Sequence, residues 1–149
     1  MDKGIYCLVL RNAACFVNVG ALGRRSFAAG FHVYVGSAQG SGGLKRVARH
    51  IRLARNHDRH PKWHIDYLLS STGFVLCAVA CAHTEEKLEC VLAGRFGGTP
   101  VPLFGCSDCS CSSHLLYYPD SPKEQIKKAF KTLGLNPTIK TIIYLTHRL

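Results

Sequence analysis

Two short apolar runs constrain the fold more than any other feature of this chain. The first, Ile5 to Leu10, follows Gly4, and the second, Phe31 to Gly36, ends in a glycine. Both runs are rich in β-branched and aromatic residues, so each is predicted to be a buried β-strand. Cys15 to Val19 is expected to be the hairpin partner of the first strand, and Phe74 to His83 a further buried strand.

Helical periodicity follows the first three predicted strands. From Leu44 to Arg55, the apolar residues recur at intervals that place them on one stripe of a helix. Further helices are predicted at Trp63 to Leu69, after Thr84, and from Ser121 to Gly134, before a last strand at Thr138 to Leu145. The chain is therefore expected to be an α/β (α+β) protein, with a small, mostly antiparallel central sheet flanked by helices.

The length of 149 residues fits one compact domain. Residues 1–118 contain most of the predicted strands and helices and are expected to form the main domain. Residues 119–149 are expected to form a C-terminal helix–strand extension. Because the connection at 119–121 is too short to free a second domain, the extension should pack on the main domain.

Positive charge is concentrated in one part of the chain. The formal net charge is +10, and seven of the nineteen lysines and arginines lie between positions 45 and 62. These seven are Lys45, Arg46, Arg49, Arg52, Arg55, Arg59 and Lys62. Such a bias favours a polyanionic partner, because basic side chains steer phosphates and release their counterions. The predicted partner is a nucleic acid; the alternative is a solvated helix face.

Membrane insertion and secretion are not expected. The longest uninterrupted apolar run, Phe74 to Ala82, is far below the roughly 18 residues needed to span a bilayer. The apolar residues near the start are not followed by a cleavage site for a secretory leader. The eight cysteines are therefore interpreted as reduced thiols in the cytoplasm.

Two phenols, a guanidinium and an imidazole suit phosphodiester hydrolysis. Tyr6 and Tyr34 each lie two residues from a glycine, and Arg46 and His50 lie four residues apart on one flank of the predicted helix. A phenol near a cation can relay a proton from water, arginine can grip a phosphate, and histidine can shuttle a proton. Taken singly, the tyrosines also fit a core role, and the other two fit an exposed basic helix.

The ordered combination resembles the GIY-YIG nuclease superfamily, over roughly residues 4–118. The residues that carry the resemblance are Gly4-Ile5-Tyr6, Tyr34-Val35-Gly36, Arg46 and His50, followed by Glu89 on a later helix. Further segments look like an uncharacterised prokaryotic branch of that superfamily: Tyr34 to Ala38, Arg49-His50, Trp63 to Leu68, Glu89-Cys90 and Ser107-Asp108-Cys109 through His114. The separation of the two tripeptides is longer than usual, which implies an insert at about residues 11–30 that leaves Tyr6 and Tyr34 on adjacent strands.

The resemblance implies a catalytic site. Tyr6 would be the general base or its partner, Tyr34 would orient water or phosphate, Arg46 would stabilise the developing charge, and His50 would assist proton transfer. Glu89 would hold a single Mg²⁺ or Mn²⁺, with the nearby Glu85 and Glu86 as competitors. Asp108 is a loose candidate for the polar residue that often completes the site.

A cysteine cluster allows a different metal. Cys106, Cys109, Cys111 and His114 lie within nine residues and could bind Zn²⁺, with His83 or Cys90 as a recruited ligand. The alternative is a set of ordinary small thiols packed under a loop.

Three functions follow from these observations. The first is a metal-dependent endonuclease that hydrolyses DNA phosphodiester bonds, with RNA as an alternative substrate, in repair or processing of structured DNA. The second is a non-catalytic nucleic-acid-binding module of the same fold. The third is a zinc-stabilised adaptor that binds nucleic acid or protein.

Overall fold

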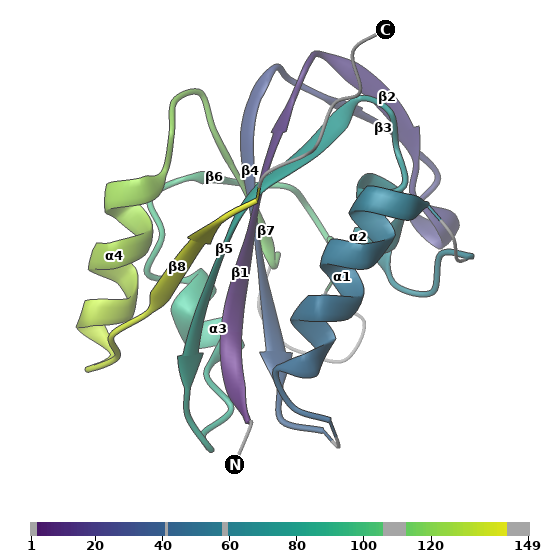
Figure 1. The fold of residues 1–149 in the computed structure, drawn as a ribbon. Coiled ribbons are helices and arrows are strands. Elements are labelled where there is room, and N and C mark those ends of the chain that lie inside the picture. Colours follow the sequence, from purple (N-terminus) through teal and green to yellow (C-terminus); the bar gives the residue numbers. More distant parts are fainter. Residues whose placement is uncertain (1–2, 41, 58–59, 106–112, 143–149) are drawn as a thin grey trace, which may run out of the picture.

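The computed structural model describes residues 3–40, 42–57, 60–105 and 113–142. They form an α+β fold around a six-stranded antiparallel sheet in the order β6-β7-β4-β1-β5-β8 (Figure 1). Its strands are β1 (Gly4–Asn12), β4 (Gly30–Ala38), β5 (Phe74–His83), β6 (Thr99–Pro100), β7 (Leu115–Tyr118) and β8 (Thr138–Thr141). The predicted fold class is confirmed.

The two apolar runs at residues 5–10 and 31–36 lie side by side at the centre of the sheet. Strands β1 and β4 pair antiparallel, with Tyr6 opposite Gly36 and Leu8 opposite Tyr34. Directly opposite residues project to the same side of a sheet, and alternate residues along a strand share a face. Tyr6 and Tyr34 therefore lie on one face of the sheet, and on adjacent strands as the resemblance implied.

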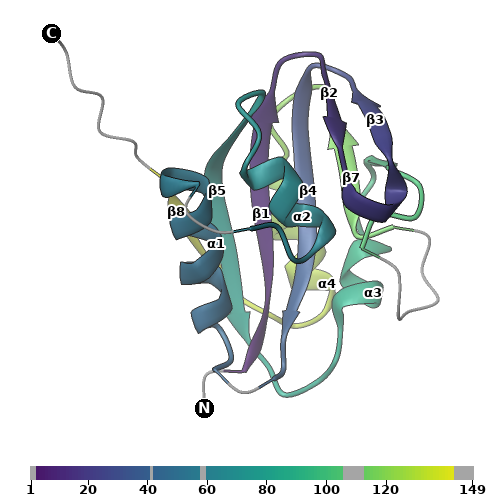
Figure 2. The same ribbon diagram turned by 90° about the vertical axis from the view of Figure 1, so that its right-hand side faces the viewer.

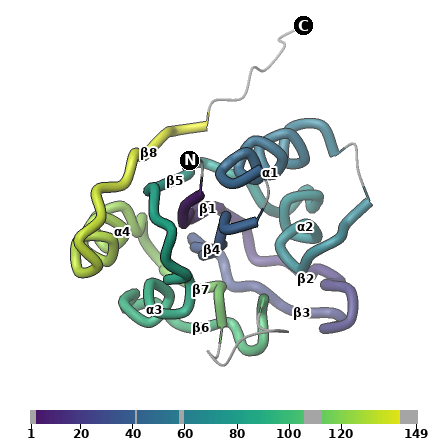
Figure 3. The backbone as a smooth tube through the Cα atoms, turned by 90° about the horizontal axis from the view of Figure 1, so that it is seen from below, coloured from purple at the N-terminus to yellow at the C-terminus, as the bar shows by residue number. Residues whose placement is uncertain are grey.

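Helices cover both faces of the sheet, as the view from below shows (Figure 3). One face carries α1 (Lys45–Asn56) and α2 (His64–Leu69), and the other carries α3 (Glu89–Ala93) and α4 (Lys123–Thr132). Along β1, Leu8 is packed in the core that contains Val47 of α1, whereas Val9 belongs to the core that contains Leu92 and Phe130. This alternation produces two apolar cores, one on each side of β1.

The expected hairpin partner of the first strand was wrong. Cys15–Asn18 (β2) pairs with Arg24–Phe27 (β3) in a separate two-stranded sheet, because β4 and β5 occupy both edges of β1. A 3₁₀ turn at Gly20–Leu22 joins the two strands. The hairpin lies beside α2 (Figure 2), and it corresponds to the insert predicted at about residues 11–30.

The C-terminal helix and strand are part of the same packed structure. Ile126 and Phe130 of α4 are buried in the core on the α3 side, and β8 pairs with β5 at the edge of the sheet. The predicted strand continued to residue 145, but residues 143–149 lie outside the described part of the chain. Within the described residues, no helix is long and apolar enough to cross a membrane.

Candidate active site

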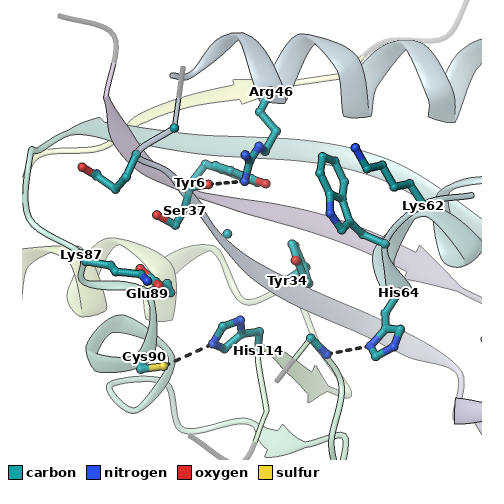
Figure 4. Close-up of a pocket in the computed structure, with 15 residues that line it drawn as sticks. Tyr6, Tyr34, Ser37, Arg46, Lys62, His64, Lys87, Glu89, Cys90 and His114 are labelled. Atoms are coloured by element: carbon teal, nitrogen blue, oxygen red, sulfur yellow. Dashed lines mark hydrogen bonds between the residues drawn. The ribbon is translucent and has the colours of Figure 1, made fainter. Parts of the chain in front are cut away.

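A cleft of about 810 Å³ opens beside the central strands (Figure 4). It brings together side chains from β1, β4, α1, α3 and the loops between them. The residues that line it are Tyr6, Tyr34, Gly36, Ser37, Gln39, Gly40, Arg46, Lys62, Trp63, His64, Lys87, Glu89, Cys90, Gly105 and His114. Four of the five residues predicted for catalysis or metal binding, namely Tyr6, Tyr34, Arg46 and Glu89, therefore meet in one cleft.

A glycine makes room for the first tyrosine. The Tyr6 ring lies across the backbone of Gly36 on the neighbouring strand, and a Cβ atom at Gly36 would overlap the Tyr6 phenol. A side chain at this position would thus push the phenol out of place. The contact between Tyr6 of the first tripeptide and Gly36 of the second explains physically why these two positions hold a tyrosine and a glycine.

Arg46 points from the first turn of α1 into the cleft (Figure 4). Its Nη1 donates a hydrogen bond to the carbonyl oxygen of Ser37, at 2.8 Å. Its guanidinium also lies over the Trp63 ring, 5.0 Å from the centroid. These two contacts hold the positive charge at the wall of the cleft, where an anion can reach it.

His50 does not line the cleft but lies behind Tyr6. Its side chain is buried, and its Nε2 is 2.8 Å from the Tyr6 hydroxyl. Burial lowers the pKa of His50 to about 4, so the imidazole is neutral at neutral pH. Burial raises the pKa of Tyr6 well above its usual value, the Tyr34 phenol adds to this effect, and Arg46 opposes it. The site therefore holds a protonated phenol hydrogen-bonded to a neutral imidazole.

Glu89 is the carboxylate that reaches the cleft. It is only 8% exposed, and its Oε2 has no hydrogen-bond partner among the described residues. Glu85 and Glu86 are exposed and do not line the cleft. The predicted helix from Thr84 begins only at Glu89, because the Thr84 hydroxyl accepts a hydrogen bond from the Glu86 amide in a preceding turn.

A buried, unpartnered carboxylate oxygen facing a polar cleft fits a hard divalent cation. Among the described residues, no group of three or more histidine, cysteine, aspartate or glutamate side chains is placed to hold a metal ion. Glu89 thus offers one protein ligand to a cation that would keep most of its water or take phosphate oxygens. Mg²⁺ is commonly bound in this way.

A thiol and an imidazole meet on the same side of the cleft as Glu89, across from Arg46 (Figure 4). The Cys90 Sγ lies 3.4 Å from the His114 Nε2, and both residues line the cleft (Figure 4). Cys106, Asp108, Cys109 and Cys111 lie outside the described residues. Of the predicted cluster, the structure therefore places only His114, beside one of the two residues named as additional ligands.

The predicted nucleic-acid-binding residues fall into different environments. Lys45, Arg52 and Arg55 are exposed on α1, and Lys62 lies at the cleft. Arg49 instead binds the Asp66 carboxylate through both terminal nitrogens, at 3.2 and 3.1 Å. Arg59 lies outside the described residues.

The sequence did not single out Gln39, Lys87 or Asp66 for this site. The first two line the cleft, and no sequence pattern marks them. Asp66 is buried behind it, in the first turn of α2. Its place near the start of a helix is a signal for capping, but not for contact with α1.

The fold and the cleft define a small α+β domain with a polar, phenol- and arginine-lined site. The chain belongs to the family described as Domain of unknown function DUF123, whose model matches residues 5–135. The match runs from the second residue of β1 to beyond the end of α4, and it includes every residue that lines the cleft. Comparison with curated proteins and with solved structures yields no match.

Proposed function

We propose that this protein is a divalent-metal-dependent endonuclease that hydrolyses DNA phosphodiester bonds. The observation that carries the proposal is the meeting of Tyr6, Tyr34, Arg46 and Glu89 around one cleft. The likeness of the two tripeptides to the GIY-YIG superfamily supports the same reaction. RNA is the alternative substrate.

The protein side chains would divide the reaction among them. Arg46 would bind the scissile phosphate and offset the charge that develops in the transition state. Tyr6 would accept a proton from the attacking water while it passes its own proton to the Nε2 of His50. Tyr34, on the same sheet face, would orient the water or the phosphate.

The coupled transfer of two protons, from water to Tyr6 and from Tyr6 to His50, removes the need for a free phenolate. Tyr6 cannot supply a free phenolate, because burial raises its pKa. His50 is a weak base at a pKa of about 4. A bound phosphodiester brings negative charge near the imidazole, which favours the protonated form and raises the pKa of His50. Substrate binding would thus prepare the proton acceptor.

Glu89 would hold the Mg²⁺ or Mn²⁺ ion at the edge of the cleft opposite Arg46 (Figure 4). A divalent ion bound there supplies Lewis-acid stabilisation of negative charge on a phosphate oxygen. The neighbouring Lys87 adds a further positive charge to the lining. The cleft would therefore present cationic groups to the phosphate from two sides.

The basic face would bring the polyanion to the cleft. Lys62 lies at the cleft itself, and Lys45 is exposed in the first turn of α1, next to Arg46 in sequence. Between positions 3 and 57 the chain contains no aspartate or glutamate. A surface of one sign attracts phosphates without reading base sequence.

A cleavage assay on single-stranded, duplex, flap and junction DNA, with Mg²⁺, Mn²⁺ or a chelator, tests the proposal. Wild type should cut at least one structured substrate only with the metal. Tyr6→Phe and Arg46→Ala should each reduce the rate by about 100-fold or more, whereas Lys128→Ala on α4 should not. If wild type is inert on every substrate yet binds DNA, the protein is a binding module without this activity.

A zinc-stabilised adaptor remains a second candidate because Cys90 and His114 are in contact. These are the ligand types that Zn²⁺ prefers. Stoichiometric zinc in purified protein, lost in Cys90→Ser and in His114→Ala, would support the adaptor. Zinc-free protein with full stability would exclude it.

A further inference from the structure

Asp66 is a buried carboxylate with a complete set of partners. Its Oδ2 accepts hydrogen bonds from the backbone amides of Lys62 and Trp63, at 2.8 and 3.0 Å. The Arg49 guanidinium grips both carboxylate oxygens. Burial alone would raise the pKa of Asp66, but these bonds outweigh it and leave the pKa below its usual value. Asp66 is therefore a fixed negative charge inside the protein.

This charge faces the side of His50 that does not contact Tyr6. The Nδ1 of His50 is 4.0 Å from the Asp66 Oδ1 and has no hydrogen-bond partner among the described residues. A neutral imidazole has one protonated nitrogen and one lone pair. If the lone pair were on Nδ1, it would point toward the carboxylate, which is unfavourable in a poorly solvated interior.

We propose that Asp66 is a positioning residue: held by Arg49, it keeps the proton of His50 on Nδ1, so that Nε2 accepts the proton of Tyr6. The chain of contacts then runs from α2 through α1 to the cleft. Arg49 fixes Asp66, Asp66 sets the tautomer of His50, and His50 receives the hydrogen bond of the phenol. The role in proton transfer rests on the proposed nuclease function, whereas the tautomer does not.

Burial, with help from Arg49 and Arg46, explains why a carboxylate so close does not make His50 an imidazolium. The charged and titratable groups around this ring are Arg46 and Arg49 on α1, Asp66 on α2, and Tyr6 on β1. Asp66 raises the pKa of His50, but both arginines lower it and burial lowers it most. The paired carboxylate can therefore orient the imidazole proton while the ring stays neutral.

Nuclear magnetic resonance tests the tautomer without any substrate. In wild-type protein labelled with ¹⁵N at histidine, long-range ¹H–¹⁵N correlations at pH 7 should show His50 with a protonated Nδ1 and an unprotonated Nε2. Loss of the signal pattern in His50→Gln assigns the resonance. A His50 protonated on Nε2 in the wild-type protein would overturn the proposal, whether or not any variant folds.

Asp66→Asn then tests the cause. Removal of the charge should lower the ratio of the Nδ1-protonated to the Nε2-protonated tautomer of His50 by about tenfold. This is the effect of about one pKa unit at one nitrogen. Asp120→Asn, at an exposed position, should leave the ratio unchanged, and Arg49→Lys, which keeps a cation beside Asp66, should largely retain it. An unchanged ratio in folded Asp66→Asn would also refute the assignment.

The pH profile of cleavage separates positioning from folding. Because Asp66 raises the pKa of His50, Asp66→Asn should lower the rate and shift the acidic limb of the profile to lower pH. A purely structural defect would lower the rate without shifting the acidic limb of the pH–rate profile. That result would contradict the proposal. If no cleavage occurs at all, the nuclease function fails, and the tautomer measurement still decides the assignment of Asp66.

Discussion

Two buried histidines should make this protein sensitive to mild acid. His32 and His50 are each 1% exposed, and burial lowers the pKa of each from its ordinary value of 6.5 to about 4. His32 lies at the opposite end of β4 from Gly36. Its Nδ1 is 2.8 Å from the Asn12 Oδ1. The Asn12 amide nitrogen donates to the carbonyls of Ala13 and Ala28, so its oxygen is left to accept from His32.

The sign of the effect follows from the direction of the shift. Between pH 6.5 and about 4, the unfolded chain binds protons at both histidines and the folded protein does not. Acidification through this window therefore lowers the free energy of unfolding. At about 1.36 kcal/mol for each pH unit, each histidine can remove about 3 kcal/mol. Together they approach the total stability of about 5–15 kcal/mol that is typical of a domain.

Urea unfolding at several pH values between 4.5 and 7 measures this loss. His32→Gln removes one of the two protonation sites, so its unfolding free energy should depend less steeply on pH, by about 1.4 kcal/mol per pH unit at the middle of the window. The exposed His83→Gln is the matched control and should keep the wild-type slope. If His32→Gln and wild type have the same slope, the buried neutral imidazole is not the cause.

Further predictions concern the cleft. Gly36→Ala should displace the Tyr6 phenol, abolish cleavage and lower the free energy of unfolding by about 1–3 kcal/mol. Gly97→Ala, which has open space around it, should have none of these effects. Cleavage assays and urea denaturation measure both variants. Lys45→Ala should weaken binding to all DNA sequences alike and reduce the salt slope by about 1, as measured by fluorescence anisotropy at several salt concentrations. A salt slope equal to that of wild type would remove Lys45 from the binding surface.

The sequence predicted the central elements because their patterns are local. The runs at the start of the chain and around Tyr34 are apolar and β-prone, and the stripe from Leu44 to Ala54 has helical spacing. The pairing of β1 with β4 was also predicted, from the resemblance, since Tyr6 and Tyr34 needed adjacent strands. Cys15–Asn18 was assigned to the wrong partner because local turn signals do not show which edges β1 has left free.

The site was predicted less completely, because burial and partners depend on tertiary contacts. Glu85, Glu86 and Glu89 look alike in the sequence, but Glu85 and Glu86 precede α3 and are exposed, whereas Glu89 begins α3 and is buried. Arg49 was expected to bind nucleic acid, but α2 packs beside α1 and brings Asp66 to Arg49.

The most direct test of the nuclease proposal compares two glutamates on the same short segment. Cleavage of the best structured DNA substrate should be followed at increasing Mg²⁺ concentration for wild type, Glu89→Ala and the exposed control Glu85→Ala. We expect Glu85→Ala to match wild type and Glu89→Ala to lose at least about 100-fold in rate or require far more metal. Equal activity in the two variants, with both folded, would contradict the account.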